Sequence, residues 1–209
     1  APAPYHAMYS ERDVPPAVRS EEERRDPHPV YGAFMQQLES RTFARDEVRH
    51  TVIPAYMGLI AQIDEHVGRL MRFMEDAGRM GDTLVVFTSD HGSHFRTRNL
   101  EYKRSPHDAS IRVPLVIAGP DFGGGVRRSD MATNLDLLPT VLSAAGAPDD
   151  HELDGRPLQR VDRAPADVFV QISESQIGRA IRTATHTFAV EAPTRNPLAG
   201  HQHPGSDRY

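Results

Sequence analysis

A helical spacing of apolar residues dominates the first half of the chain. Between residues 46 and 78, apolar side chains recur at intervals of three and four, namely Tyr56, Leu59, Ile60, Ile63, Val67, Leu70, Met71 and Met74. This spacing predicts one long amphipathic helix whose apolar stripe faces a core. Gly78 and Gly81 suit the end of that helix, and Pro54 is expected near its start or at a kink.

Two short apolar runs and a second helical pattern follow. Residues 83–88, TLVVFT, and 113–118, VPLVIA, are rich in β-branched and aromatic residues. Such runs are typical of strands that are covered on both faces of a parallel or mixed sheet. Residues 134–145 have helical spacing, with Asn134 as the expected cap and Gly146 as the stop. Helices and strands in this order predict an α/β fold.

The pattern changes after residue 147. Residues 148–165 are polar and loop-like. Two strands are expected beyond them, over 168–172 and over 180–190, with a break near His186. These strands predict a small second unit.

Composition narrows the class of protein. The chain has 209 residues, of which 38% are hydrophobic and 25% charged, and its net charge is −5. The acidic balance argues against a nucleic-acid partner, and no stretch approaches the roughly 20 apolar residues of a membrane helix. The chain has no cysteine, so disulfides, thiolate metal ligands and cysteine nucleophiles are excluded. Compartment and oligomeric state are left open.

Candidate chemistry follows the first predicted strand. Asp90 and His91 come just after its carboxyl end, where α/β sheets gather ligand-binding groups. A carboxylate beside an imidazole can bind one divalent cation, and Gly92 permits a tight turn. The same residue types are common in ordinary loops. Lys103 favours a functional site, because an ammonium group near a cation requires an anion between them, such as a sulfate, phosphate or phosphonate.

Several segments, taken in order, resemble the type I sulfatase family of the alkaline-phosphatase superfamily. They are TSDHG at 88–92, Lys103, SIRVPLVIAGP at 110–120 and DLLPTVLSAAG at 136–146, with weaker matches at 4–20, 56–75, 154–158 and 174–190. The resemblance extends to the related phosphonate monoester hydrolases. It implies part of an alkaline-phosphatase-like mixed sheet flanked by helices. It also assigns residues 1–147 to the carboxyl-terminal portion of the catalytic α/β domain, with 1–30 irregular. Residues 148–209 would be a linker and an incomplete C-terminal α+β subdomain.

The resemblance also implies roles for individual residues. Asp90 and His91 match metal ligands, and Lys103 matches the lysine that contacts the ester. The ion would be Ca²⁺, with Mn²⁺ or Zn²⁺ as alternatives, and the substrate a small anionic ester. His107, four residues past Lys103, is expected to face the substrate as a catalytic residue. We expect His94 to lie behind the site or in solvent.

The nucleophile that the family uses is missing from this sequence. Sulfatases resembling this chain employ formylglycine, which forms from Cys or Ser in a C/S-x-P-x-R motif. The chain has no cysteine, and none of its serines begins such a motif. The early metal-binding carboxylates also have no counterpart. We therefore expect a carboxyl-terminal part of a larger hydrolase, with formylglycine upstream, that is inactive or nearly so alone.

Several functions are compatible with these residues. Hydrolysis of a sulfate monoester by the parent protein is the first. A phosphonate or phosphate ester hydrolase on the same scaffold is the second. A two-zinc phosphatase or nucleotide phosphodiesterase is a third, to which His201 and His203 in the tail would contribute. The last is a truncated module without catalysis.

Overall fold

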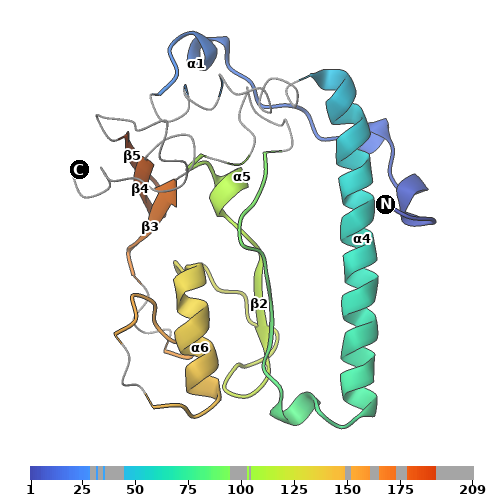
Figure 1. Cartoon of the computed structure of the whole chain (residues 1–209), viewed down its shortest axis with the longest axis vertical. Coiled ribbons are helices and arrows are strands. Elements are labelled where there is room, and N and C mark those ends of the chain that lie inside the picture. The colour runs from blue at the N-terminus through green and yellow to red at the C-terminus, as the bar shows by residue number, and fades with distance from the viewer. Residues whose placement is uncertain are drawn as a thin grey trace, which may run out of the picture.

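The structure is a computed structural model that describes residues 1–28, 32, 35, 45–94, 103, 105–148, 152–160, 165–172 and 178–191. One long helix lies along one side, a two-stranded sheet lies beside it, and a shorter helix lies across that sheet from it (Figure 1). A second sheet lies near the top of the shorter helix in the same view. The described part therefore combines helices and sheets, as the α/β prediction expected.

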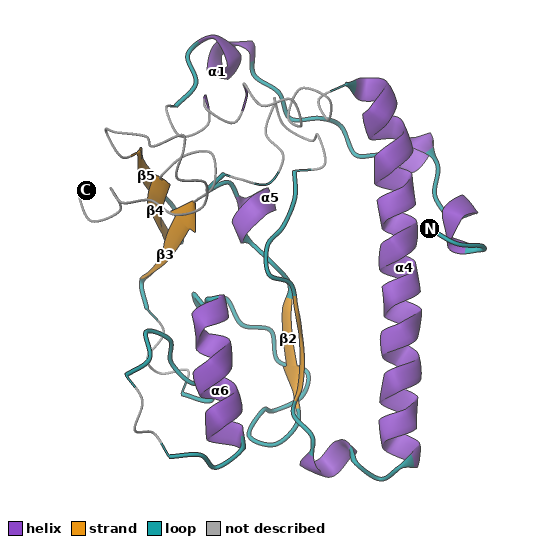
Figure 2. Cartoon of the chain, in the orientation of Figure 1, coloured by secondary structure: helices purple, strands orange, loops and turns teal. Residues whose placement is uncertain are grey.

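Helices precede the first sheet, and three consecutive strands end the described part of the chain (Figure 2). The α-helices are α1 (Glu21–Arg25), α4 (Asp46–Asp76), α5 (Asp108–Ile111) and α6 (Leu137–Ala144). The strands are β1 (Val85–Thr88), β2 (Leu115–Ala118), β3 (Asp167–Ile172), β4 (Gly178–Thr183) and β5 (Thr187–Glu191). Short 3₁₀ turns are η1 (Tyr5–Ala7), η2 (Glu11–Asp13), η3 (Met80–Asp82) and η4 (Asn134–Asp136).

Helix α4 confirms the helix predicted over residues 46–78. It ends where Gly78 takes a φ of 66°, a conformation that glycine adopts without steric cost. The Gly78 N–H donates to the carbonyl of Glu75, and the Arg79 N–H donates to that of Met74, which satisfies carbonyls of the last turn. Pro54 lies buried inside the helix.

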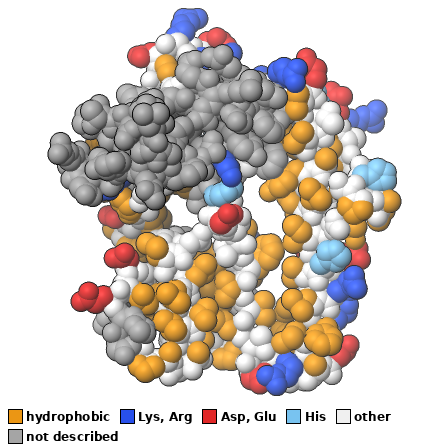
Figure 3. Space-filling model, viewed as in Figure 1, with side chains coloured by type: hydrophobic (Ala, Val, Ile, Leu, Met, Phe, Trp, Pro, Cys, Tyr) orange, Lys and Arg blue, Asp and Glu red, His pale blue; other side chains and the backbone are white. Residues whose placement is uncertain are grey.

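The apolar stripe of α4 corrects the sequence prediction. Five of its members, Tyr56, Leu59, Ile60, Ile63 and Leu70, are 40–57% exposed. Figure 3 shows hydrophobic side chains gathered on this face of the molecule. The prediction that the stripe faces a core is therefore wrong for the described part of the chain. Helical spacing identifies the apolar side of a helix but not what covers it.

The first sheet also differs from expectation. Strands β1 and β2 form, but they pair antiparallel, with Val85 opposite Ala118 and Thr88 opposite Leu115. Phe87 and Val116 are exposed, so the prediction of burial on both faces is wrong. A short apolar run does not distinguish a covered strand from one with an open face. The antiparallel pairing agrees with a mixed sheet and not with a purely parallel one.

The amino-terminal segment packs against α4. The Tyr5 hydroxyl donates to Glu65 at 2.5 Å, and Arg19 pairs with Asp46 at 2.9 Å. Beyond η1, η2 and α1 the described part of this segment is irregular, as predicted. Turns η1 and η2 contact α4, whereas Glu23 of α1 faces His107.

The second helical pattern begins one residue earlier than predicted. Thr133, not Asn134, is the cap: its hydroxyl accepts from the Leu135 N–H, and its own N–H donates to the carboxylate of Asp136. This reciprocal arrangement is a capping box. Gly146, with a φ of 66°, ends α6 as predicted.

Asp136 and Thr140 join α6 to the segment that follows it. Both are buried. The Asp136 carboxylate accepts the Arg156 N–H at 2.9 Å, and the Thr140 hydroxyl accepts the Leu158 N–H at 2.9 Å. The same hydroxyl donates to the Asp136 carbonyl at 2.6 Å. These bonds fix residues 152–160 against the helix.

The second sheet has the strand order β3-β4-β5, all antiparallel. The predicted break near His186 is a turn, in which the Thr183 hydroxyl accepts the His186 N–H at 2.9 Å. Arg182 of β4 pairs with Asp108 of α5 at 3.0 Å. The division into 1–147 and 148–209 stays a prediction. Within the described residues, no helix has the length and apolarity to cross a membrane.

We predict that Thr140→Val lowers the free energy of unfolding by about 1–3 kcal/mol, because it leaves the buried Leu158 N–H without its acceptor. Urea denaturation measures the change. Thr51→Val is the matched control, since that exposed hydroxyl also donates to the carbonyl four residues earlier in its helix. We expect about 0.5 kcal/mol or less for the control. Equal losses in both variants would contradict a stabilising role for the Thr140 bond.

Candidate metal and anion site

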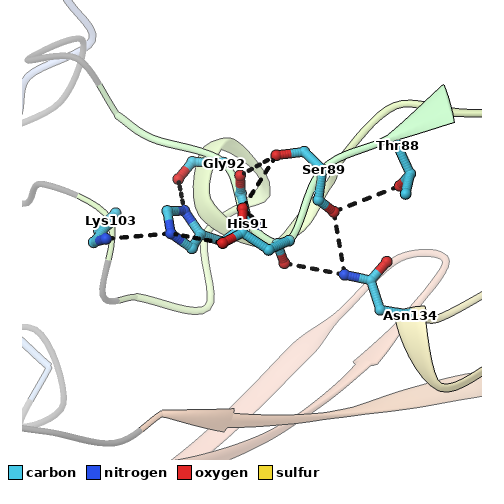
Figure 4. A network of polar contacts seen from close by, with 7 residues as sticks. Thr88, Ser89, His91, Gly92, Lys103 and Asn134 are labelled. Carbon is cyan, nitrogen blue, oxygen red and sulfur yellow. Dashed lines mark hydrogen bonds and ion pairs between the residues drawn. The ribbon is translucent and has the colours of Figure 1, made fainter.

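The loop after β1 carries the candidate site and is held from below by Asn134 (Figure 4). The Asn134 side-chain amide donates to the carbonyl of Ser89 at 3.2 Å and to that of Asp90 at 3.0 Å. The Ser89 hydroxyl donates to the His91 carbonyl at 2.9 Å. Sequence reasoning assigned Asn134 to the helix cap and missed this role.

Gly92 is required by a close approach of two backbones. Its N–H donates to the Ser110 carbonyl at 2.7 Å, and a Cβ added here would collide with the carbonyl of Ala109. The loop that contains Asp90 and His91 is thereby attached to α5. The sequence expectation of a tight turn at Gly92 had the right residue but not this contact.

Asp90 projects its carboxylate into solvent, with 83% of the side chain exposed. One carboxylate oxygen accepts the His91 N–H at 2.9 Å. This backbone hydrogen bond, followed by the electrostatic effect of the His91 ring, lowers the pKa of Asp90 below its ordinary value. The group is therefore an anion over the neutral pH range and can bind a cation.

His91 has a defined tautomer. Its Nδ1 lies 2.8 Å from the Gly92 carbonyl, which only accepts, so Nδ1 carries a proton and donates. The neutral ring then presents the lone pair of Nε2. That atom lies 3.5 Å from a carboxylate oxygen of Asp90 and 3.2 Å from Nζ of Lys103. A backbone carbonyl that orients an imidazole in this way is typical of metal-binding histidines.

The structure thus brings together Asp90, His91 and Lys103, three of the four predicted site residues. Lys103 is the only lysine in a chain with 24 lysines and arginines. A single lysine among so many arginines could have marked Lys103 as a site residue, but the sequence analysis did not use this observation. In the structure the ammonium group donates to His91 Nε2, the same atom that a metal ion would need.

The fourth predicted residue, His107, has different neighbours. Its Nδ1 lies 3.2 Å from the hydroxyl of Ser105, and Nε2 of His94 lies 2.7 Å from that same hydroxyl. His94 is fully buried, so the expected position in solvent is wrong. The other expected position, behind the site, is compatible with this burial. The sequence had no signal for the shared serine.

The described part of the chain offers few further metal ligands. His201 and His203 in the tail lie outside the described residues. Within the residues that the structure describes, no group of three or more His, Asp or Glu side chains could hold a metal ion. Asp90 and His91 are therefore a pair of possible ligands, whereas Ca²⁺ takes about six to eight.

Solved structures share this fold. A phosphonate monoester hydrolase of Agrobacterium radiobacter superposes with a TM-score of 0.74 at 21% identity, covering 91% of this chain and 47% of that chain. A protein solved in complex with its substrate D-glucosamine-2-N,6-O-disulfate has a TM-score of 0.65 at 22% identity, covering 71% of this chain and 33% of that one. The alkaline-phosphatase-like fold predicted from sequence is confirmed.

Curated relatives match in sequence. The multifunctional alkaline phosphatase superfamily protein PehA of Trinickia caryophylli is 34% identical over 172 residues, which are 76% of this chain and 34% of PehA. Arylsulfatase K of Danio rerio is 34% identical over 151 residues, 72% of this chain and 28% of the relative. This chain spans about a third of the length of these relatives.

The Sulfatase family model matches residues 4–147, which include Asp90, His91 and Lys103. The match covers more than half of the chain and agrees with the relatives and with the fold. The chain belongs to the Sulfatase family, a family of hydrolases.

Proposed function

We propose that the protein to which this chain belongs hydrolyses a sulfate monoester of a small molecule. The observation that carries the proposal is the convergence of Asp90 and the only lysine, Lys103, on Nε2 of His91, at 3.5 and 3.2 Å, after the end of β1. Membership of the Sulfatase family and the similarity to arylsulfatase K support it.

Asp90 and His91 would hold the metal ion. A carboxylate that is ionised at neutral pH and an imidazole whose Nδ1 donates to a carbonyl, which leaves Nε2 to face a ligand, suit a cation. Such a pair suits Ca²⁺, the ion that the family resemblance implies, and also admits Mn²⁺ or Zn²⁺. When bound, the ion would act as a Lewis acid toward an ester oxygen.

Lys103 would bind the anionic group of the ester. An ammonium group and a divalent cation repel each other, and an anion between them turns both contacts into attractions. The ammonium would then stabilise negative charge that develops on the transferred group or on the leaving oxygen. Lysine suits this role as a compact point charge, unlike the planar fork of arginine.

Catalysis also needs a nucleophile, which we infer to be a formylglycine outside these 209 residues. The sequence has neither a cysteine nor a Ser-x-Pro-x-Arg motif from which it could form. We therefore expect the chain alone to bind without turnover. His107 is proposed to transfer a proton to or from the substrate.

Phosphonate ester hydrolysis is the second candidate. The fold superposes on a phosphonate monoester hydrolase with a TM-score of 0.74, and the relative PehA is named as multifunctional. A two-zinc phosphatase is less well supported, because the described residues lack the additional cluster of ligands that a second ion needs.

Lys103→Ala in the complete enzyme should lower kcat/KM for 4-nitrophenyl sulfate by about 10²–10³-fold, the usual effect of removing a group that stabilises transition-state charge. Arg72→Ala is the matched control, since it removes one positive charge from the exposed side of α4. Its kcat/KM should be unchanged. The same assay with a phosphonate monoester compares the two candidate substrates. An unchanged kcat/KM in Lys103→Ala would refute the role of Lys103.

Cation binding to the chain itself can be measured by titration with Mn²⁺ in a calorimeter. Lys103→Met should tighten binding roughly 5- to 30-fold, because each pair of unit charges about 4 Å apart in water repels by about 1 kcal/mol. His91→Ala should weaken it, and Arg72→Met should leave it near the unmodified value. Weaker binding in Lys103→Met would show that the ammonium does not compete with the ion for His91.

A further inference from the structure

Four residues, two of them within four positions of Lys103 in the sequence, form a connected polar chain. Nε2 of His94 lies 2.7 Å from the Ser105 hydroxyl, which lies 3.2 Å from Nδ1 of His107. Nε2 of His107 lies 3.8 Å from a carboxylate oxygen of Glu23 in α1. His94 is fully buried, and Ser105 is 2% exposed. The two imidazole rings meet edge to face, with centroids 5.5 Å apart.

The central hydroxyl couples the protons of the two rings. Ser105 has one hydroxyl proton, so it can donate to one ring nitrogen and must accept from the other. The ring nitrogen to which Ser105 donates has no hydrogen of its own. The ring nitrogen from which Ser105 accepts carries a hydrogen. The tautomer of His94 therefore determines the tautomer of His107, and the reverse also holds.

Glu23 decides between the two possible directions. Its carboxylate only accepts, so its charge favours a proton on the facing Nε2 of His107. A neutral ring then has a bare Nδ1, to which Ser105 donates, while Ser105 accepts from Nε2–H of His94. The His107 backbone N–H, 3.4 Å from the same oxygen, takes one of the two lone pairs of Ser105 in either direction, so the hydroxyl cannot accept from both rings. The opposite direction would place the Nε2 lone pair of His107 against the carboxylate.

We propose that Ser105 and His94 are positioning residues that hold His107 in the tautomer with its proton on Nε2. The inference depends on the proposed function only for the use of that proton, which His107 would give to the leaving group of the ester. Ser105 is also two residues past Lys103, so the same hydrogen bonds restrain the backbone that carries the ammonium group.

Ser110 provides a matched control. Like Ser105 it is 2% exposed, but its hydroxyl has no hydrogen-bond partner in the structure as described. Ser105→Ala and Ser110→Ala therefore remove the same atom from the same depth. Only Ser105→Ala removes a hydroxyl that links two histidines by hydrogen bonds.

The experiment is nuclear magnetic resonance of the chain labelled with ¹⁵N-histidine, at a pH about two units above the usual imidazole pKa of about 6.5. Long-range ¹H–¹⁵N correlations distinguish a bare ring nitrogen from a protonated one. The spectra of His94→Gln and His107→Gln assign the two rings among the 11 histidines. We expect a bare Nδ1 and a protonated Nε2 in His107, with Nε2 of His94 protonated.

In Ser105→Ala, His107 should shift to a mixture of tautomers, Ser105→Thr should keep the single form, and Ser110→Ala should match the unmodified chain. A protonated Nδ1 in neutral His107 of the unmodified chain would overturn the proposal, as would an unchanged tautomer in folded Ser105→Ala. If that variant does not fold, the unmodified spectrum alone decides. Neither substrate nor metal is added, so the result is separate from success or failure of the proposed hydrolysis.

Discussion

The geometry of the candidate site depends on the two hydrogen bonds from the Asn134 amide to the carbonyls of Ser89 and Asp90. They orient the backbone just before His91, whose ring is fixed in turn by the Gly92 carbonyl. A loop with two exposed polar side chains, Asp90 and His91, has little apolar contact to hold it. Its conformation is therefore determined by polar bonds to a helix that is itself well anchored.

The anchor is the start of α6. Thr133 and Asp136 close the cap on either side of Asn134, so the backbone of Asn134 cannot rotate freely. Asp136 and Thr140 are buried and bind the backbone of the following segment. These hydrogen bonds at the start of α6 therefore restrain Asn134, whose side chain binds the loop after β1. Site and scaffold are one hydrogen-bonded system.

Local patterns predicted the elements and the Asp90–His91 pair, because helix spacing, strand composition and residues at a strand end are properties of short segments. Contacts between distant segments were not predictable in this way. Thr133 and Asn134 are adjacent and both suit a helix cap. The sequence therefore did not show which residue caps the helix and which binds the loop after β1. No sequence pattern indicated that Ser105 would bind both His94 and His107. The exposed apolar stripe of α4 has the same residue spacing as a buried stripe.

The contact between Lys103 and His91 has a thermodynamic consequence for how ligands bind. The ammonium group donates to Nε2, so a cation that takes this lone pair must displace the ammonium or share the site with an anion. An anion that pairs with Lys103 removes that competition and raises the affinity for the cation. By linkage the cation must raise the affinity for the anion by the same factor. Under the proposed function, the arrangement would therefore favour joint binding of an ion and an anionic ester over binding of either alone.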